Sequence, residues 1–268
     1  MSKASQRFKQ RNNGIGTLKR ISENLSEYFI IHYSCESFFD LPEGNTPRIT
    51  SIAIKQLKNG LTNSFSIHKI AEIKQIPNNK IDESYNDLEK EMLDEYFEFV
   101  QNHSDKKWIH INMRNINYGF EAIKHRYRVL GGTPVEISDD RKIDLARLFT
   151  FVYGKNYIEH PKFESLYKLN KITLIGFLSG KEEAKAFEKG NYVALHQSTL
   201  RKVDCMSDVL SLAIENDLKT RSNVIKKYGF TPSGVFYAAK ENWIIAIILF
   251  LIATVITSLV GIGISKIL

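Results

Sequence analysis

The apolar residues in the first third of the chain are spaced as in β-strands. Tyr28–Tyr33 (YFIIHY) is a short run of aromatic and β-branched residues, which is typical of a buried strand. Ile49–Leu57 (ITSIAIKQL) predicts a second strand, and Thr62–Ile70, where apolar and polar residues alternate, predicts a third. The Asn-Gly pair at 59–60 is a strong hairpin turn signal. We therefore expect a three-stranded meander.

After residue 81 the spacing changes to a helical period. In Asp82–His103 apolar residues recur every three or four positions, which predicts an amphipathic helix with its acids on a solvated outer face. Lys107–Met113 predicts a fourth strand, and a second helix begins near Phe120 and ends at the Gly-Gly-Thr-Pro of 131–134. Val135–Ile137 predicts a short fifth strand.

Further helices are expected near residues 142–153, 161–170, 181–189 and 195–220. A meander followed by strands that are reached through helices predicts an α/β fold, with a mixed five-stranded sheet and flanking helices. The same order of elements describes the ribonuclease H-like fold.

One long stretch of the chain carries no charge. Trp243–Ile264 (WIIAIILFLIATVITSLVGIGI) has 22 residues. At about 1.5 Å per residue, such a helix is roughly 33 Å long and crosses a hydrocarbon core of about 30 Å. A buried core helix is the alternative, but such helices are rarely apolar for more than about 14 residues. We expect a transmembrane helix over 243–264.

The rest of the chain divides into three parts. Residues 1–26 form an expected basic flexible arm, because the first 20 residues hold six Lys or Arg and no acid. A solvated tail without a partner is the alternative for this segment. Residues 27–220 form the α/β domain, and residues 221–242, which contain two glycines and a proline, are expected to be a linker.

The composition limits where the protein works and what it binds. The formal net charge is +7, which suits nucleic acid or an anionic lipid surface. Two cysteines give no disulfide framework, and no apolar segment opens the chain, so we expect the domain in the reducing cytoplasm. Lys226, Lys227 and Lys240 precede the predicted span and only Lys266 follows it, which favours a single-pass protein with its N-terminal domain cytoplasmic.

Four short segments carry further information. Residues 34–37 (SCES) follow the first strand, 110–118 (HINMRNINY) the fourth, 142–149 (KIDLARLF) open a helix, and 199–204 (TLRKVD) lie in the last one. With the order of elements, they resemble motifs of the DnaQ-like 3′–5′ exonucleases over residues 28–215. In that family the corresponding motifs are Asp-x-Glu-Thr, His-Asn-x-x-Phe-Asp, a helix start with Asp-Thr and Leu-Ala, and a His or Tyr followed by Asp.

The resemblance implies a nuclease site in which four carboxylates hold two divalent metals, Mg²⁺ or Mn²⁺. Glu36 and Asp204 are the acids that remain in register, so they are the expected catalytic residues and metal ligands. Asn115 and Asp144 are weaker catalytic candidates. The departures are Ser34 for the first Asp, Asn115 or Asn117 for the third acid, and Thr199 for the catalytic His or Tyr. Two carboxylates are too few for a working pair of metals.

Three interpretations of these departures stay open. The resemblance is a coincidence, or it is real and catalysis has been lost, which leaves a binding or sensing domain. Alternatively, catalysis has been rebuilt from other acids, such as Asp40, Asp139, Asp140 or Asp144.

Basic residues near these motifs suggest a ligand. Arg114, Lys124 and Arg128 surround the fourth strand and second helix, and Arg201 and Lys202 precede Asp204, so these five are the predicted nucleic-acid-binding residues. A generic basic surface is the alternative. The chain has no zinc-ligand spacing, no phosphate-binding P-loop motif and no dinucleotide-binding glycine motif, which disfavours those classes.

Small residues form a stripe on the predicted span. Ala253, Thr257 and Gly261 recur every fourth position, a spacing that lets helices pack closely and predicts association in the membrane, with a second copy or another partner. Ordinary membrane-helix composition is the alternative. The leading hypothesis is a tail-anchored protein whose impaired exonuclease-like domain binds or senses nucleic acid or a nucleotide, with bacterial defence as one setting. The alternatives are an active, membrane-tethered, metal-dependent nuclease and a structural adaptor that docks a protein partner.

Overall fold

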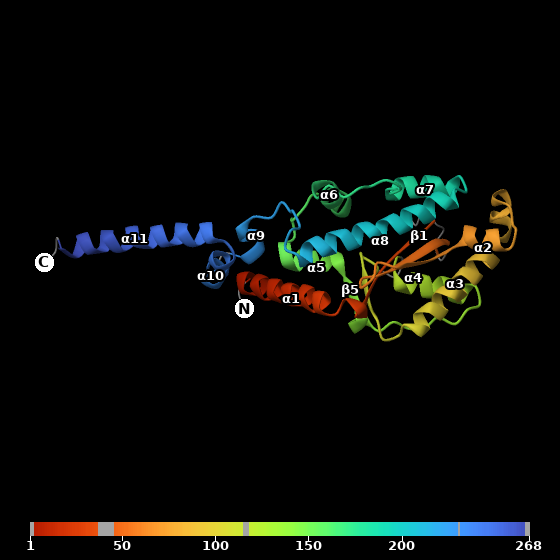
Figure 1. The fold of residues 1–268 in the computed structure, drawn as a ribbon, viewed down its shortest axis with the longest axis horizontal. Coiled ribbons are helices and arrows are strands. Elements are labelled where there is room, and N and C mark those ends of the chain that lie inside the picture. Colours follow the sequence, from red (N-terminus) through yellow and green to blue (C-terminus); the bar gives the residue numbers. More distant parts are fainter. Residues whose placement is uncertain (1–2, 37–45, 115–117, 230, 266–268) are drawn as a thin grey trace. The chain divides into compact units, whose positions relative to one another are not determined.

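A computed structural model describes residues 3–36, 46–114, 118–229 and 231–265 (Figure 1). The chain forms two compact units. The sheet unit comprises residues 17–148 and 160–219, and the helical unit comprises residues 1–16, 149–159 and 220–268. Each unit is described by itself.

The sheet unit is built on a mixed sheet with the spatial order β3-β2-β1-β4-β5. Its strands are β1 (Tyr28–Cys35), β2 (Ile49–Gln56), β3 (Thr62–Ser66), β4 (Lys107–His110) and β5 (Lys142–Asp144). The meander β1-β2-β3 is antiparallel, whereas β4 and β5 run parallel to β1. The prediction of an α/β fold with a mixed five-stranded sheet is therefore confirmed.

Alternate residues of β1 face two different layers of helices, as the two-residue period of a strand requires. Phe29, Ile31 and Tyr33 belong to the main apolar core, which they share with α3 (Tyr85–Asn102). Ser34 points the other way and contacts Thr199. Helix α8 (Tyr192–Ile214) packs along β1 and β2 on that second face. The remaining helices of the sheet unit are α2 (Ile67–Ile73), α4 (Phe120–Val129), α6 (Lys162–Leu169) and α7 (Gly180–Glu188).

Two strand predictions were wrong. The predicted third strand, 62–70, ends at Ser66, because Ile67, Ile70 and Ala71 bury one face of α2 instead of alternating. The fifth strand is Lys142–Asp144 and not Val135–Ile137. Lys142–Asp144 pairs with β4 through three residues, whereas 135–137 lies outside every strand.

The N-terminal segment also differs from its prediction as a flexible arm. Residues Lys3–Glu23 form a single helix, α1. Leu18 and Ile21 are buried, and so is the charged residue Arg11. Within the sheet unit, the end of this helix is therefore held by buried apolar side chains, although the sequence of the helix is strongly basic.

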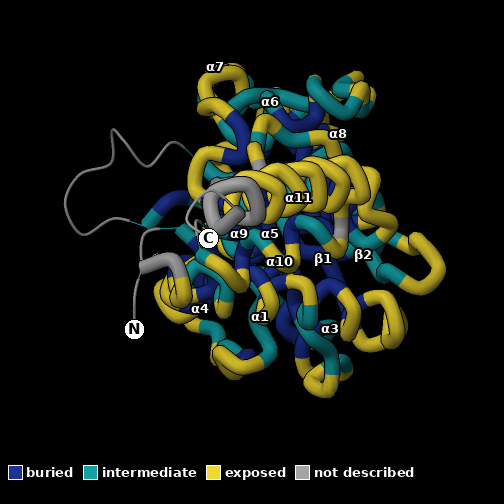
Figure 2. Tube along the Cα trace, turned by 90° about the vertical axis from the view of Figure 1, so that its left-hand side faces the viewer, coloured by how far each residue is buried: buried dark blue, intermediate teal, exposed yellow. Residues whose placement is uncertain are grey.

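The helical unit contains the C-terminal helices. Within the predicted linker, 221–242, lie α9 (Val224–Tyr228) and α10 (Pro232–Glu241). They are followed by α11 (Trp243–Ser265), which is exposed over most of its described residues (Figure 2). Helix α5 (Leu145–Tyr153) begins in the sheet unit and ends in the helical unit.

Candidate functional site

A network of hydroxyl groups occupies the end of β1, where the family resemblance places its first Asp. The Ser34 hydroxyl donates to Glu183 Oε1 over 2.8 Å, and the Thr199 hydroxyl lies 2.8 Å from Ser34 Oγ. Ser51 Oγ lies 2.7 Å from Thr199 Oγ1. Ser34, Ser51 and Thr199 are all buried. The two substituted positions, 34 and 199, therefore touch each other through neutral groups.

Glu183 anchors this network, although no motif pointed to it. Its Oε1 also accepts from the Ser198 hydroxyl at 2.9 Å, and its Oε2 is 2.6 Å from Lys202 Nζ. Glu183 reaches the network from α7, whose start is set by a capping box of Ser179 and Glu182. Lys202, a predicted nucleic-acid-binding residue, is thus bound to an acid of its own domain.

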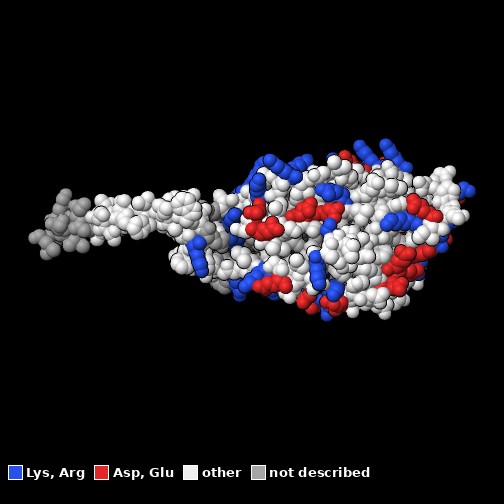
Figure 3. Space-filling model, in the orientation of Figure 1, with Lys and Arg blue, Asp and Glu red and all other residues white. Residues whose placement is uncertain are grey.

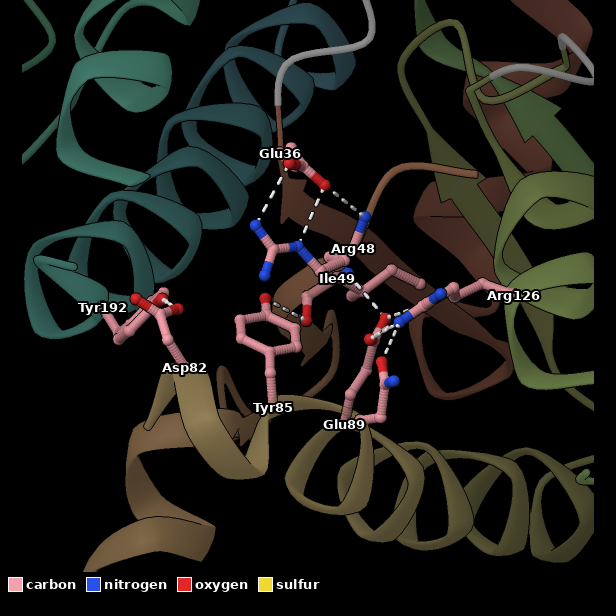
Figure 4. Close-up of polar contacts among 9 residues, drawn as sticks. Glu36, Arg48, Ile49, Asp82, Tyr85, Glu89, Arg126 and Tyr192 are labelled. Atoms are coloured by element: carbon pink, nitrogen blue, oxygen red, sulfur yellow. Dashed lines mark hydrogen bonds and ion pairs between the residues drawn. The ribbon is translucent and has the colours of Figure 1, made fainter. Parts of the chain in front are cut away.

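Glu36 lies just beyond β1 and is fully engaged by one arginine (Figure 4). Arg48 Nε lies 3.1 Å from Glu36 Oε2, and Arg48 Nη2 lies 3.2 Å from Oε1. The Arg48 guanidinium also stands over the rings of Tyr85 and Phe187, 4.7 Å and 4.8 Å from their centroids. A bidentate pair of this kind leaves the Glu36 carboxylate little capacity to bind a cation.

Beside this pair lies a buried ion pair that the sequence patterns did not indicate. Glu89 has no exposed surface, and its Oε2 is 2.6 Å from Arg126 Nη2. Glu89 Oε1 accepts from the Ile49 backbone N–H at 2.7 Å (Figure 4). The helical period predicts a solvated face for the acids of this helix, and Glu89 is an exception. Only the position of Glu89 one residue after Leu88, near the apolar stripe, could have suggested otherwise.

Asp204 lies on α8 and contacts a different part of the sheet from Glu36. Its Oδ1 is 2.7 Å from Lys55 Nζ, and Arg201 Nη1 is 3.9 Å from its Oδ2. Lys55 pairs with Ile30 in the β1–β2 register, six positions before Glu36. Six residues of strand span about 20 Å. The two expected metal ligands therefore do not converge.

The two-metal centre implied by the resemblance does not fit these residues. Glu36 and Asp204 each bind a cationic side chain of the domain, and hydroxyls stand at 34 and 199. No group of three His, Cys, Asp or Glu in the described part of the chain is arranged to hold a metal ion. Asn115, Asn117 and Asp40 lie outside the described residues. No reaction step through Mg²⁺ or Mn²⁺ can be built from this set.

A cavity lies beside the last residues of β4 and β5, apart from Glu36 and Asp204. It has a volume of about 400 Å³ and lies at the carboxyl ends of β4 and β5, where His110 and Asp144 are register partners. We call it the carboxyl-edge cavity. Its lining residues are His110, Met113, Arg114, Phe120, Glu121, Asp139, Lys142, Asp144 and Arg147.

Asp144 organises one wall of the carboxyl-edge cavity. Its Oδ1 accepts from the backbone N–H groups of Ala146 and Arg147, at 2.9 and 3.2 Å, and so caps the start of α5. Its Oδ2 forms an ion pair with Arg114, whose side chain is 54% exposed. Arg114 can therefore meet an incoming anion while it still contacts Asp144.

His110 completes that wall as a neutral group. Its Nδ1 accepts from the Met113 backbone N–H at 3.1 Å. The pKa of His110 is lowered to about 4, mainly by burial; Asp144 opposes this shift, and the positive charges of Arg114 and Lys142 add to it. The imidazole is thus uncharged at neutral pH. The basic residues of the lining are Arg114, Lys142 and Arg147, and the acids Glu121, Asp139 and Asp144 line the same cavity. Lys142 Nζ lies 2.8 Å from Asp139 Oδ1.

The other predicted nucleic-acid-binding residues do not form a cleft with Arg114. Lys124 is buried and ion-paired with Glu121 and Glu136. Arg201 donates to the Thr173 carbonyl, and Arg128 is exposed on α4. Acidic and basic side chains are interspersed on the face shown in Figure 3. Most of the predicted cleft residues therefore serve ion pairs and hydrogen bonds within the domain.

The net charge is divided unevenly between the two units. The sheet unit contains 27 basic and 28 acidic residues, a formal charge of −1. The helical unit contains ten basic and two acidic residues, a formal charge of +8. The basic character of the chain thus belongs to the unit that carries α11.

Helix α11 is long and apolar enough to cross a membrane, and it is the one helix of the described residues with that property. Ala253, Thr257 and Gly261 lie on it, and the Thr257 hydroxyl donates to the Ala253 carbonyl at 2.8 Å. No protein-family model, characterised protein or solved structure matches the chain.

Proposed function

We propose that this protein is a membrane-anchored binding protein, whose sheet unit holds a small phosphate-bearing ligand in the carboxyl-edge cavity. The ligand class is a nucleotide or the terminal nucleotide of a nucleic acid. The observation that carries the proposal is a cavity of about 400 Å³ in whose lining Arg114 is 54% exposed, so that its guanidinium can bind an anion although Asp144 contacts it. Small-molecule sites commonly have volumes of about 300–1,000 Å³.

The position of the cavity supports the same proposal. In open α/β sheets, ligands bind in the crevice beyond the carboxyl ends of the parallel strands. Phe120 and Met113 are buried beneath the cavity and form the apolar part of its lining, against which a base would lie while Arg114 binds a phosphate. The order of elements on which the exonuclease resemblance rests is also present, with a meander followed by strands reached through helices.

Two observations favour binding without hydrolysis. The acids that remain from the exonuclease motifs, Glu36 and Asp204, are paired with Arg48 and Lys55 and lie apart. The sheet unit has a formal charge of −1, which disfavours binding of a long nucleic acid along its surface. A cavity-sized ligand fits this charge balance better.

The anchor in this proposal is α11, crossing the membrane once with the sheet unit on the cytoplasmic side. The excess of lysines before the span supports that orientation. The stripe of Ala253, Thr257 and Gly261 supports self-association or a partner helix in the membrane. Ligand binding would then act on a protein that is already held at the bilayer.

Equilibrium binding by the full chain in lipid nanodiscs tests the proposal. Fluorescent mononucleotides and single strands of increasing length are titrated with and without Mg²⁺, and the recovered ligand is analysed for cleavage. We expect saturable binding of intact ligand, with an affinity that levels off after the first one or two nucleotides. Absence of binding, metal-dependent cleavage, or an affinity that keeps rising with strand length would each contradict it.

A further inference from the structure

The helical unit concentrates positive charge next to the apolar helix. Its formal charge is +8, against −1 for the sheet unit. Lys9, Lys226 and Lys240 are exposed, on α1, α9 and α10. A basic segment close to a membrane span is attracted to the negative surface of an anionic leaflet.

Hydrogen bonds fix these helices to one another within the unit. Arg7 Nε donates to the Lys226 carbonyl at 2.9 Å, and Arg7 Nη2 donates to the Val152 carbonyl at 3.2 Å. Arg11 is buried, donates to the same Val152 carbonyl at 2.8 Å, and stands over the Tyr228 ring, 4.4 Å from its centroid. These two arginines therefore join α1 to the end of α5 and to α9. Their guanidinium groups are used in contacts within the unit.

Helix α10 has one aromatic face. Its Gly234 and Ala238 are buried, and a Cβ at Gly234 would lie 2.6 Å from the Gly229 carbonyl, so only glycine allows the close approach. Phe236 is 65% exposed, and Tyr237 lies beside it and packs on Phe8, with ring centroids 4.6 Å apart. One side of α10 thus packs inward, and the aromatic side is left open.

The aromatic face continues directly into the span. Trp243, the first residue of α11, is 71% exposed, and the exposed Lys240 lies three positions before it. Asn242 separates the two helices and caps the second, since its Oδ1 accepts from the Ile244 backbone N–H at 3.0 Å. Aromatic residues gather at membrane interfaces, and lysines beside them face the phosphate groups.

We propose that the helical unit is a lipid-headgroup module: α10 lies in the interface of an anionic leaflet through Phe236 and Trp243, while Lys9, Lys226 and Lys240 bind the headgroup phosphates. The partner is anionic phospholipid around the chain's own anchor. This surface is separate from the carboxyl-edge cavity and shares no residue with it.

Lipid selectivity of the full chain tests this surface. The chain is reconstituted into vesicles, and the association of spin-labelled phosphatidylglycerol and phosphatidylcholine with the first lipid shell is compared. We expect phosphatidylglycerol to be preferred by about threefold or more, and the preference to vanish near 1 M salt. Lys226→Glu with Lys240→Glu should abolish it, whereas Lys58→Glu with Lys181→Glu, the same charge change on exposed residues of the sheet unit, should not.

The depth of α10 is measured separately. In Phe236→Trp, quenching by lipids brominated near the headgroup should exceed quenching by lipids brominated near the chain ends, relative to the parent chain. Equal lipid association in a chain that still resists carbonate extraction would overturn the module but leave the anchor of the proposed function intact. Loss of the lipid preference on addition of a single-stranded oligonucleotide would assign the basic surface to nucleic acid and would also overturn the module.

Discussion

The hydroxyl of Thr199 lies 2.8 Å from the hydroxyl of Ser34, at the positions where the exonuclease motifs would place a catalytic His or Tyr and the first Asp. Their contact is buried and continues to the carboxylate of Glu183. The end of β1 is therefore a satisfied polar cluster, because each of these groups has a partner within the domain.

A carboxylate placed in this cluster should destabilise the fold. Ser34→Asp puts a second acid beside Glu183 in a buried site, and we expect the apparent Tm of the full chain in detergent to fall by about 5–10 °C. Ser34→Ala, which loses hydrogen bonds only, should lower it by about 2–4 °C. Circular dichroism measures both. A rise in the Tm of Ser34→Asp on addition of Mg²⁺ would show that the site is a latent metal centre instead.

The Glu89–Arg126 pair should be far more sensitive than the nearby surface arginine. Arg126→Met leaves the buried Glu89 carboxylate without its main partner and should cost about 3–5 kcal/mol. Arg128→Met, on the exposed side of the same helix, should change stability by less than about 0.5 kcal/mol. Denaturant unfolding in detergent compares the two, and similar losses in both variants would contradict the structural role of the pair.

Buried histidines predict a loss of stability in mild acid. Burial lowers the pKa of His196 to about 4, with Lys69 and His68 on α2 acting in the same direction. The unfolded chain binds protons near pH 6.5, whereas the folded chain does so only near pH 4, so stability should fall as the pH drops from about 6.5 to 4.

Removing His196 should weaken that dependence. The Tm of His196→Asn measured between pH 7 and pH 4.5 should fall less steeply than that of the parent chain. His125→Asn, a change at an exposed histidine of α4, serves as the control and should keep the parent slope. Identical slopes in all three proteins would exclude His196 as a source of the acid sensitivity.

Helix α11 should stay in the membrane when apolar residues near its centre are made smaller, but not when they are made charged. Two arginines at the helix centre, Ile252→Arg with Val255→Arg, should cost about 5–7 kcal/mol of insertion free energy. The chain should then move from the membrane fraction to the soluble fraction on carbonate extraction. Ile252→Ala with Val255→Ala should remain in the membrane, and equal behaviour of the two double variants would contradict a transmembrane role for α11.

Most of the fold could be predicted from the sequence because apolar spacing follows burial. Strands at 28–33 and 49–57 and the helix at 82–103 correspond to β1, β2 and α3. The third strand was overextended because Phe65 and Ile67 alternate across the junction of β3 and α2. The fifth strand is too short, at three residues with charged ends, for its period to be visible.

The first helix and the site were harder to predict. In α1 the apolar stripe is weak beside the many basic residues; it consists of Phe8, Ile15, Leu18 and Ile21. Nothing in the local sequence shows that Arg7 and Arg11 bind carbonyl groups 140 or more residues away. Glu183 and Glu89 reach their partners through tertiary packing alone. The motifs do not show the partners that neutralise Glu36 and Asp204, which are Arg48, just before β2, and Lys55, within β2.

The most direct test of ligand binding in the carboxyl-edge cavity is the effect of Arg114→Ala on the Kd for a nucleotide, measured on the full chain in nanodiscs. Loss of a charge-assisted contact to phosphate should weaken binding by about tenfold or more. Arg128→Ala removes the same charge from an exposed position that does not line the cavity, and it should leave the Kd unchanged. Equal Kd values for Arg114→Ala and the parent chain would contradict the account.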